Sequence, residues 1–227
     1  MGLLGRAVLA FWHDIASGGD AEFNYWHTRE HIPERIAIPG FLRGRRYEAV
    51  QGGPRYFNLY ETADLATLES PAYVERLNNP TPWTRRVLPL FRNSKRTACR
   101  IVLSLGDGIG GALATLDLGP QAGHEEELRG WLGGTGLVAV ADRPGIVGVH
   151  LCEADVAATQ VKARTQEGAL QDRTDVLARW VILVEGIGHE SVNAACDQFL
   201  GADALARHGA TTETASGAYR LACCLAR

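Results

Sequence analysis

The sequence predicts an α+β fold made of two similar halves, each with the element order β-α-β-β-α-β. Three observations predict it: four segments recur in the same order, the apolar runs have the periods of strands and helices, and turn residues separate these runs. The chain has 227 residues, which is enough for one large domain or two small ones. A tandem arrangement of two such units therefore fits the length.

The internal repeat is carried by four pairs of segments. The pairs are Arg6–Phe11 with Gly111–Leu116, Ile38–Ala49 with Arg143–Ala154, Arg55–Glu61 with Arg179–Glu185, and Cys99–Leu105 with Tyr219–Leu225. The first two pairs are 105 residues apart and the third is 124 apart, so 19 residues are inserted, in the polar stretch at about 156–175. Each match is weak by itself, but four in the same order are hard to obtain by chance.

The first half begins with a strand and a helix. The run AVLAFWH is apolar and β-rich, which predicts a strand. Asp20 then predicts the N-cap of a helix from about Ala21 to Ile36. Pro33 cannot continue the helical hydrogen bonding, so the helix is expected to bend or end its regular turn near His31.

A hairpin and a second helix complete the unit. The hairpin consists of FLRGRRYEAV, the turn QGGP, and RYFNLYET. Thr62 or Asp64 is expected to cap a helix over Leu65–Leu77, and an irregular proline-rich segment leads to the last strand, ACRIVLSL. This order is the ferredoxin-like unit. Both helices lie on one side of its sheet, so the second half can cover the other, apolar face, sheet on sheet.

The expected units are residues 1–105 and 112–227, joined by a glycine-rich link at 106–111. The link, GDGIGG, fits the pattern G-x-G-x-x-G of dinucleotide-binding proteins and follows a strand. That pattern must open a helix, whereas here the repeat predicts a strand over ALATLDL. We therefore predict a flexible link, and we do not expect a nucleotide site.

Composition excludes several classes of function. A formal net charge of −3 gives no general attraction to nucleic acid or to an anionic membrane. No apolar run reaches the ~18–20 residues that a membrane span needs, and the N-terminus lacks the features of a signal peptide. Five scattered cysteines predict buried thiols, with neither a disulfide framework nor a zinc knuckle. A cytoplasmic protein is expected, and a homodimer is left open.

The segment EFNYWHTREHIPERI, followed by PGFLRGRRY, resembles the EthD-like branch of the dimeric α/β-barrel superfamily. The resemblance covers most of residues 5–105 and, more faintly, the second half. It implies a barrel made from two ferredoxin-like units, here fused in one chain, with a small-molecule pocket between each sheet and its helices. It fixes no reaction, because the superfamily includes cofactor-free monooxygenases, haem enzymes, isomerases, cyclases and members without known activity.

His31 is the first candidate for a reactive residue, as a general acid/base, because imidazole titrates near neutral pH. His27 lies one turn before it on the same helix face and is the second. A core histidine bonded to a backbone carbonyl is the alternative for both. His27, His31 and Glu34 also form a two-histidine, one-carboxylate set. Three ligands on one helix rarely converge on one ion, so metal binding is a minority hypothesis.

Several further side chains are candidates for substrate contact: all but Trp26 lie on strands that could wall the pocket, and Trp26 lies on the first helix, in the segment that carries the resemblance. These residues are His13, Trp26, Arg43, Tyr47, Tyr56, Asn58 and Tyr60. His13 is expected at the pocket mouth or at the end of its strand in solvent. Tyr56, Asn58 and Tyr60 could instead form an internally hydrogen-bonded layer between the sheets.

Three classes of function remain open. The first is a cofactor-independent monooxygenase, isomerase or cyclase acting on a small aromatic or polyketide-like molecule. The second is a non-catalytic ligand-binding or assembly module, whose pocket would be filled by side chains. The third is a metal- or haem-dependent oxidoreductase. One site per chain is expected, in the first half, because the shift of 105 places Leu132 over His27 and Gly136 over His31.

Overall fold

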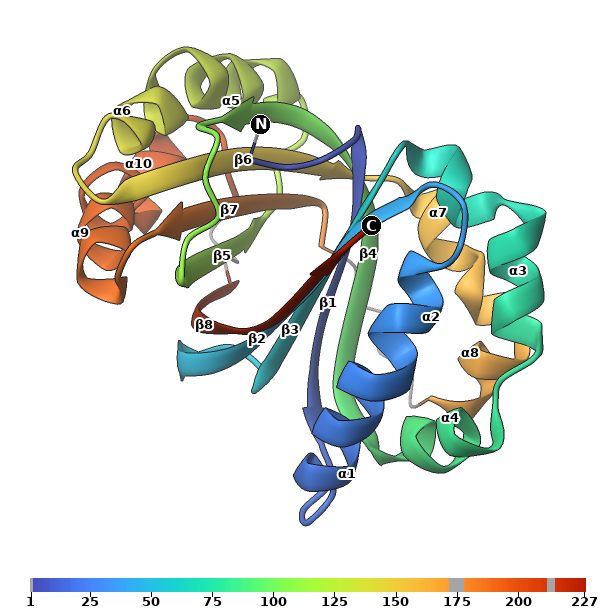
Figure 1. The fold of residues 1–227 in the computed structure, drawn as a ribbon. Coiled ribbons are helices and arrows are strands. Elements are labelled where there is room, and N and C mark those ends of the chain that lie inside the picture. Colours follow the sequence, from blue (N-terminus) through green and yellow to red (C-terminus); the bar gives the residue numbers. More distant parts are fainter. Residues whose placement is uncertain (1, 172–177, 212–214) are drawn as a thin grey trace.

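The computed structural model describes residues 2–171, 178–211 and 215–227. Within them, eight antiparallel strands form a closed barrel in the order β1-β3-β2-β8-β5-β7-β6-β4 (Figure 1). The strands are β1 (Ala7–Ile15), β2 (Phe41–Gly52), β3 (Tyr56–Thr62), β4 (Phe91–Leu105), β5 (Ala112–Leu118), β6 (Ile146–Ala154), β7 (Trp180–Gly186) and β8 (Ala215–Ala226). The two predicted β-α-β-β-α-β units are confirmed.

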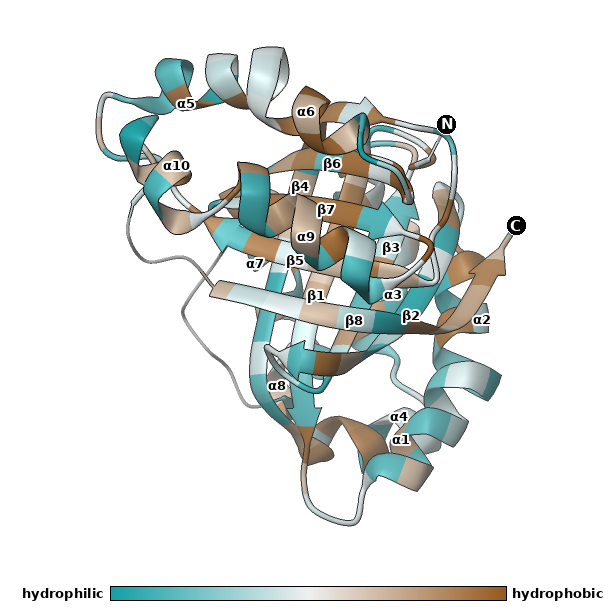
Figure 2. Cartoon of the chain, turned by 90° about the vertical axis from the view of Figure 1, so that its left-hand side faces the viewer, coloured by the Kyte–Doolittle hydropathy of each residue, from teal (hydrophilic) through white to brown (hydrophobic). Residues whose placement is uncertain are grey.

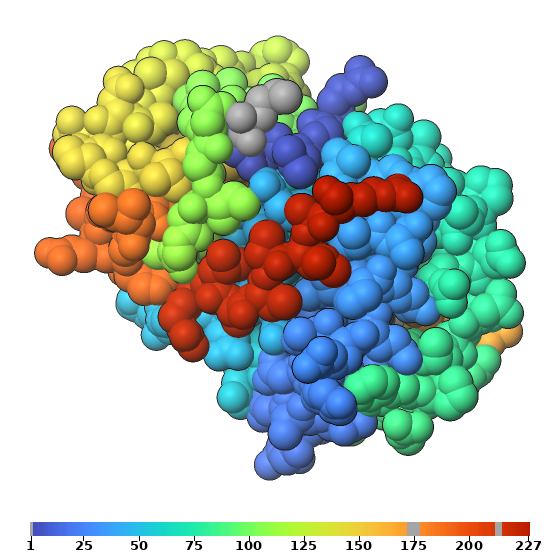
Figure 3. All heavy atoms as spheres, viewed as in Figure 1, coloured from blue at the N-terminus to red at the C-terminus, as the bar shows by residue number. Residues whose placement is uncertain are grey.

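The barrel closes because the edge strands of each half pair with those of the other. β2 pairs with β8, and β4 pairs with β6, so no sheet edge is left open between the halves. Figure 3 shows β8, in red, lying across the blue first half. The predicted intramolecular barrel is therefore confirmed, and a second chain is not needed to close it.

The helices form two layers outside the barrel. Those of the first half are α1 (Asp20–Trp26), α2 (Ile32–Ile36), α3 (Pro71–Asn78) and α4 (Pro82–Val87), and those of the second are α5 (Glu125–Trp131), α6 (Leu137–Ala141), α9 (His189–Phe199) and α10 (Ala202–Arg207). Each layer covers the sheet of its own half in Figure 1. The helices α7 (Val156–Gln160) and α8 (Gln166–Leu170) differ, because they belong to the second half but lie beside α3 and α4.

Apolar side chains form a core inside the barrel and others between the sheets and the helices. The barrel interior holds Trp12, Phe57, Val181, Leu183 and Tyr219, among others. Figure 2 shows hydrophobic colours along β6 and β7. The side of these strands that faces away from the barrel interior packs against the helices of the second half. No helix among the described residues is long and apolar enough to cross a membrane.

A charged cluster also lies inside the barrel. The side chains of Glu61 and Glu185, which occupy equivalent places in the two halves, are fully buried. Arg45, also fully buried, pairs with both, at 2.9 Å to Glu61 and 2.8 Å to Glu185. Burial acts to raise the pKa of Glu185, but hydrogen bonding to His150 and the charge of Arg45 hold that pKa below its usual range.

Each half has a π-helical turn at the same place in its first helix. In the first half it spans His27–His31, and in the second Leu132–Gly136, which is 105 residues later. The predicted irregularity near His31 is confirmed. However, Pro33 is not its general cause, since Val138 stands at the equivalent position of the second half and the turn forms there too.

Three local expectations need correction. Residues 106–111 are not a free link, because Gly106 accepts a hydrogen bond from Gly2, and Gly110 donates one to Glu185. β5 does follow them, which agrees with the absence of a dinucleotide fold there. Gly19 rather than Asp20 is the N-cap of the first helix. Asp64, one of the two expected caps, does cap the next element, but the single helix expected over Leu65–Leu77 is divided into a 3₁₀ turn at Leu65–Glu69 and the helix α3, which Ser70 caps.

Two further sequence predictions concern the cysteines and the insertion. The cysteines are not all buried thiols: Cys99 and Cys152 are, whereas Cys224 is exposed. The insertion predicted at about 156–175 contains α7 and α8, and its residues 172–175 lie outside the described part of the chain.

Candidate functional site

The candidate site is built on the π-turn of the first helix. The amide of Ile32 donates to the carbonyl of His27, the wide i to i+5 bond of such a turn. Both predicted histidines consequently face the sheet, with their ring centres 5.5 Å apart. π-turns are uncommon and are frequent at functional sites, but both halves contain this one, so the histidines on it and not the turn itself mark the first half as the site candidate.

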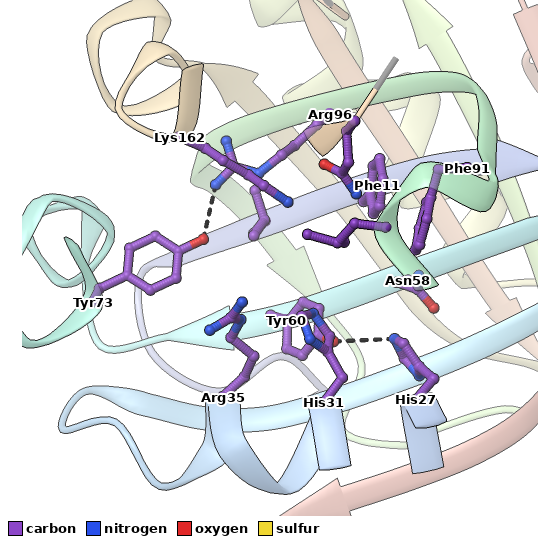
Figure 4. Close-up of a pocket in the computed structure, with 13 residues that line it drawn as sticks. Phe11, His27, His31, Arg35, Asn58, Tyr60, Tyr73, Phe91, Arg96 and Lys162 are labelled. Atoms are coloured by element: carbon purple, nitrogen blue, oxygen red, sulfur yellow. Dashed lines mark hydrogen bonds between the residues drawn. The ribbon is translucent and has the colours of Figure 1, made fainter. Parts of the chain in front are cut away.

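A small cavity lies between this helix face and the first sheet (Figure 4). Its volume is about 20 Å³, room for roughly one water molecule. The lining residues are Leu9, Phe11, His27, His31, Arg35, Asn58, Tyr60, Tyr73, Leu88, Phe91, Arg96, Lys162 and Gln171. Aromatic and aliphatic groups form one part of the wall, and imidazoles, an amide and three cationic side chains form the rest.

Three imidazoles gather at the site and are electrically neutral at pH 7. Burial lowers the pKa of His13 to about 3. It also lowers the pKa values of His27 and His31 well below the usual 6.5, and the positive charges of Arg46 and Arg35 act in the same direction. A neutral imidazole can accept a proton, although its lowered pKa makes it a weaker base than a histidine in water.

Hydrogen bonds fix the tautomer of His27. The guanidinium of Arg46 lies 3.3 Å from its Nδ1 atom, and this nitrogen must accept because Arg46 only donates. The proton of His27 is therefore assigned to Nε2, which lies 3.2 Å from the Tyr60 hydroxyl oxygen. Tyr60 then accepts from His27, which leaves the Tyr60 hydroxyl proton to point to another partner.

Four buried polar atoms of the cavity-lining residues have no hydrogen-bond partner within the described chain. They are Nδ1 of His31, Nη1 of Arg35, Oδ1 of Asn58 and Nε2 of Gln171. His31 itself is partly exposed, but its Nδ1 atom is buried, and its ring packs at a tilt against Trp26 with 4.3 Å between ring centres. Buried polar atoms are normally paired, so these positions fit a ligand or bound water.

The structure brings four of the nine predicted side chains to the cavity and places three more behind it. His27, His31, Asn58 and Tyr60 line the cavity. His13, Trp26 and Tyr56 do not. His13 is fully buried rather than in solvent or at a mouth, and its Nε2 atom lies 2.9 Å from Nδ2 of Asn58.

Trp26 and Tyr56 support the site from its outer side. Trp26 donates its indole N–H to Glu30 at 3.0 Å, which ties the helix to its own next turn. The Tyr56 hydroxyl donates to Asp20 at 2.8 Å and accepts from Asn24 at 3.0 Å, and burial raises the pKa of Tyr56 to about 12. Both residues hold the first helix in place and do not reach the cavity.

The expectation that Arg43 and Tyr47 wall the pocket is wrong. Both side chains point into the barrel, where Arg43 pairs with Glu61 at 2.7 Å and Tyr47 packs against Phe57. Alternation along β2 puts Arg46 on the helix side instead. The prediction chose the wrong face of this strand, because nothing in its sequence marks which polar face is inside.

The proposed metal set is not assembled. Glu34 pairs with Arg76 at 3.0 Å and with Arg35 at 3.6 Å, and it does not line the cavity beside His27 and His31. No group of three His, Cys, Asp or Glu side chains suited to a metal ion occurs among the described residues.

Sequence reasoning missed the cationic part of the wall. Arg35 lies four residues after His31 and could have been found by helical spacing. Arg96 on β4 has no local signal. Lys162 and Gln171 come from the insertion of the second half, and only the tertiary structure reveals that this insertion covers the first half.

The second half contains a larger cavity, between β5, β8 and helices α9 and α10. Its volume is about 450 Å³, and its lining includes Leu116, Leu205, Asn193, Cys196 and Asp197 but, among the described residues, neither a histidine nor a cationic side chain. The prediction of a single site in the first half therefore remains to be tested against this space.

Comparison with known proteins identifies the fold. Solved structures match nearly the whole chain: an anthrone oxidase-like protein (13% identity, TM-score 0.66, 97% of this chain and 92% of that one), and a proposed monooxygenase from Fusobacterium nucleatum (7%, 0.62, 99% and 96%). A haem-binding protein from Thermus thermophilus also matches (10%, TM-score 0.50, 96% and 91%). No protein-family model and no curated protein matches the chain.

The chain is a dimeric α/β barrel in a single polypeptide. At these identities the likeness concerns the fold alone. Because such a fold hosts many reactions, any function has to be argued from the residues of the site.

Proposed function

We propose that the first half of the barrel binds and transforms a small hydroxylated aromatic or polyketide-like molecule without a cofactor. His31 acts as the base in this proposal. The observation that carries it is the buried, unpaired Nδ1 atom of His31 at a cavity lined by Phe11, Phe91 and Tyr60. The names of the anthrone oxidase-like and monooxygenase structural relatives agree with this class of ligand.

The chemistry follows from the neutral state of the imidazoles. His31 can accept the proton of a phenol, or of a carbon acid activated by a neighbouring carbonyl, at Nδ1. The free proton of Tyr60 can bond the developing oxyanion. An anion beside the imidazolium would raise the pKa of His31 again, so the proton transfer becomes more favourable once a ligand is bound. An electron-rich carbanion of this kind can react with oxygen directly.

Ligand binding at this cavity requires part of the protein to move. A cavity of about 20 Å³ cannot hold an aromatic ring, so Lys162, Gln171 or the α7–α8 segment must shift on binding. The same small volume favours the alternative of a non-catalytic module with a filled pocket. The alternative of a metal- or haem-dependent oxidoreductase has less in its favour, because Glu34 does not join His27 and His31, and no histidine of the described residues lines the larger cavity of the second half.

The test uses anthrone as substrate, with consumption of oxygen and formation of anthraquinone as readouts. One anthrone and one O₂ should give one anthraquinone and one water. Titration calorimetry with the product analogue 1,8-dihydroxyanthraquinone should give about one equivalent per chain, abolished in His31→Ala. Binding that survives this change, or two equivalents per chain, would contradict the proposed site.

A further inference from the structure

The insertion of the second half builds part of the first half's site. Its residue Glu167 pairs with Arg35 at 2.5 Å, and the carbonyl of Thr159 accepts from Arg96 at 3.0 Å. Gln166 is bonded to Arg85 at 2.9 Å. Because these contacts join α7 and α8 to α2, α4 and β4, the insertion is fixed over the cavity rather than projecting into solvent.

Lys162 is the cationic side chain that the insertion places at the cavity. It is 9% exposed, it lines the same space as His31, and its ammonium lies 5.9 Å from the centre of the Phe11 ring (Figure 4). Its nearest carboxylate oxygen, on Glu167, is 3.5 Å away, which is long for a strong hydrogen bond. Burial lowers the pKa of Lys162 to about 8, so most molecules remain protonated at pH 7.

Among the described residues, the cavity wall has an excess of positive charge: Arg35, Arg96 and Lys162 line it, and no carboxylate of that part of the chain does. Behind the wall, Glu167 is shared between Arg35 and Lys162, and Glu34 also lies 3.6 Å from Arg35. The guanidinium of Arg96 donates to uncharged oxygens, the Tyr73 hydroxyl at 3.1 Å and a backbone carbonyl. Buried cations are normally balanced, so this arrangement fits a ligand that carries a negative charge.

We propose that Lys162 binds the carboxylate of the ligand, so that the ligand class is a hydroxylated aromatic carboxylate. Its hydroxyl would face Nδ1 of His31, and its ring would lie against Phe11 and Phe91. This inference rests on the proposed function, because it concerns the same cavity. Charge-assisted hydrogen bonds are about twice as strong as neutral ones, so Lys162 would set specificity as well as affinity.

A purely structural role is the competing explanation. Lys162 could serve only to anchor the insertion through Glu167. In that case its removal would lower stability and leave ligand preference unchanged. Glu167 keeps its partner Arg35 when Lys162 is replaced, so the fold should tolerate the change.

The experiment compares two probes of the same shape, 6-hydroxy-2-naphthoate and its uncharged amide, 6-hydroxy-2-naphthamide. Binding is measured by calorimetry to the full chain and to three variants. Lys162→Met removes the charge, Lys162→Arg keeps it, and Arg164→Met removes an exposed charge two residues away as the matched control. Thermal melting of each variant reports the structural contribution separately.

We expect the wild-type protein to prefer the carboxylate. Lys162→Met should weaken binding of the carboxylate about 10- to 100-fold and leave the amide within about twofold. Lys162→Arg should retain the preference, and Arg164→Met should change nothing. Equal affinity of the wild-type chain for both probes would overturn the inference while leaving the proposed function intact. If the wild-type chain binds neither probe, both the inference and the proposed function are contradicted, and no variant has to be measured.

Discussion

The two halves of the barrel share a backbone plan but differ in chemistry at the same turn. Both first helices pass through a π-turn, and a tryptophan precedes each turn. In the first half, the His31 ring packs against Trp26 at a tilt of 34°, whereas in the second Gly136 stands at that position and His208, just after α10, stacks on Trp131, at 4.2 Å. The turn is therefore a property of the fold, and the imidazoles at the cavity are an addition to it.

The difference extends to the surroundings of the turn. Leu132, which occupies the place of His27, belongs to the apolar core of the second half. The first half carries buried polar groups there and is covered by the insertion, while the second half has a larger cavity whose described lining contains the carboxylate of Asp197 and no cationic side chain. One half thus keeps an ordinary core, and the other holds polar groups that are costly to bury.

The largest effect on stability is expected from replacing Arg45, whose charge links a carboxylate of each half. Arg45→Met would leave Glu61 and Glu185 without their shared cation inside the barrel. We expect a loss of about 3–5 kcal/mol in the free energy of unfolding, measured with urea. The control is Arg220→Met, which breaks an exposed pair with Glu48 and should cost at most about 1 kcal/mol. Similar losses in both variants would refute a special role for the interior cluster.

Acid should destabilise the protein through the first half. The folded-state pKa of His13 is about 3, below the usual 6.5, so its stabilising contribution is complete above pH 6.5 and is lost as pH falls toward 3. The expected slope is about 1.4 kcal/mol per pH unit for this residue. His13→Gln should remove that slope from urea titrations between pH 6.5 and 5, and His124→Gln, on the surface of the second half, should not. An unchanged slope in His13→Gln would contradict the prediction.

Ligand binding should depend on His31 in the first π-turn and not on Gly136, its counterpart in the second. His31→Ala removes an imidazole whose Nδ1 atom has no partner among the described residues, so we expect a stability change of at most about 1 kcal/mol, from lost packing against Trp26. Ligand binding should nevertheless disappear. Gly136→Ala, its counterpart, places a methyl group 3.2 Å from the Trp131 ring and should leave binding unchanged. A large fall in melting temperature with normal binding in His31→Ala would identify a core histidine instead.

The smallest effect on stability is expected from replacing Pro33, which follows the first π-turn. Pro33 is exposed, and the second half forms its π-turn without a proline. Pro33→Ala should therefore keep the turn and change the free energy of unfolding by less than about 1 kcal/mol. The amide exchange pattern of residues 27–32 would report the turn. Conversion of this segment to a regular helix would show that the two turns have different causes.

The sequence by itself determined the repeated element order, because apolar periodicity and turn residues are local properties that survive in both halves. Helical spacing likewise placed His27 and His31 on one face, and the alternation along β3 placed Asn58 and Tyr60 together. These predictions needed only the geometry of a single element.

Only the tertiary structure decided which polar face of β2 is inside the barrel. Arg43, Arg45 and Arg46 are chemically alike, and the face that turns inward is set by Glu61 and Glu185 on other strands. The same holds for Lys162, which lies 131 residues after His31 and joins it only because the insertion packs on the other half. Contacts between distant segments depend on how whole layers pack, and no spacing within one segment carries that information.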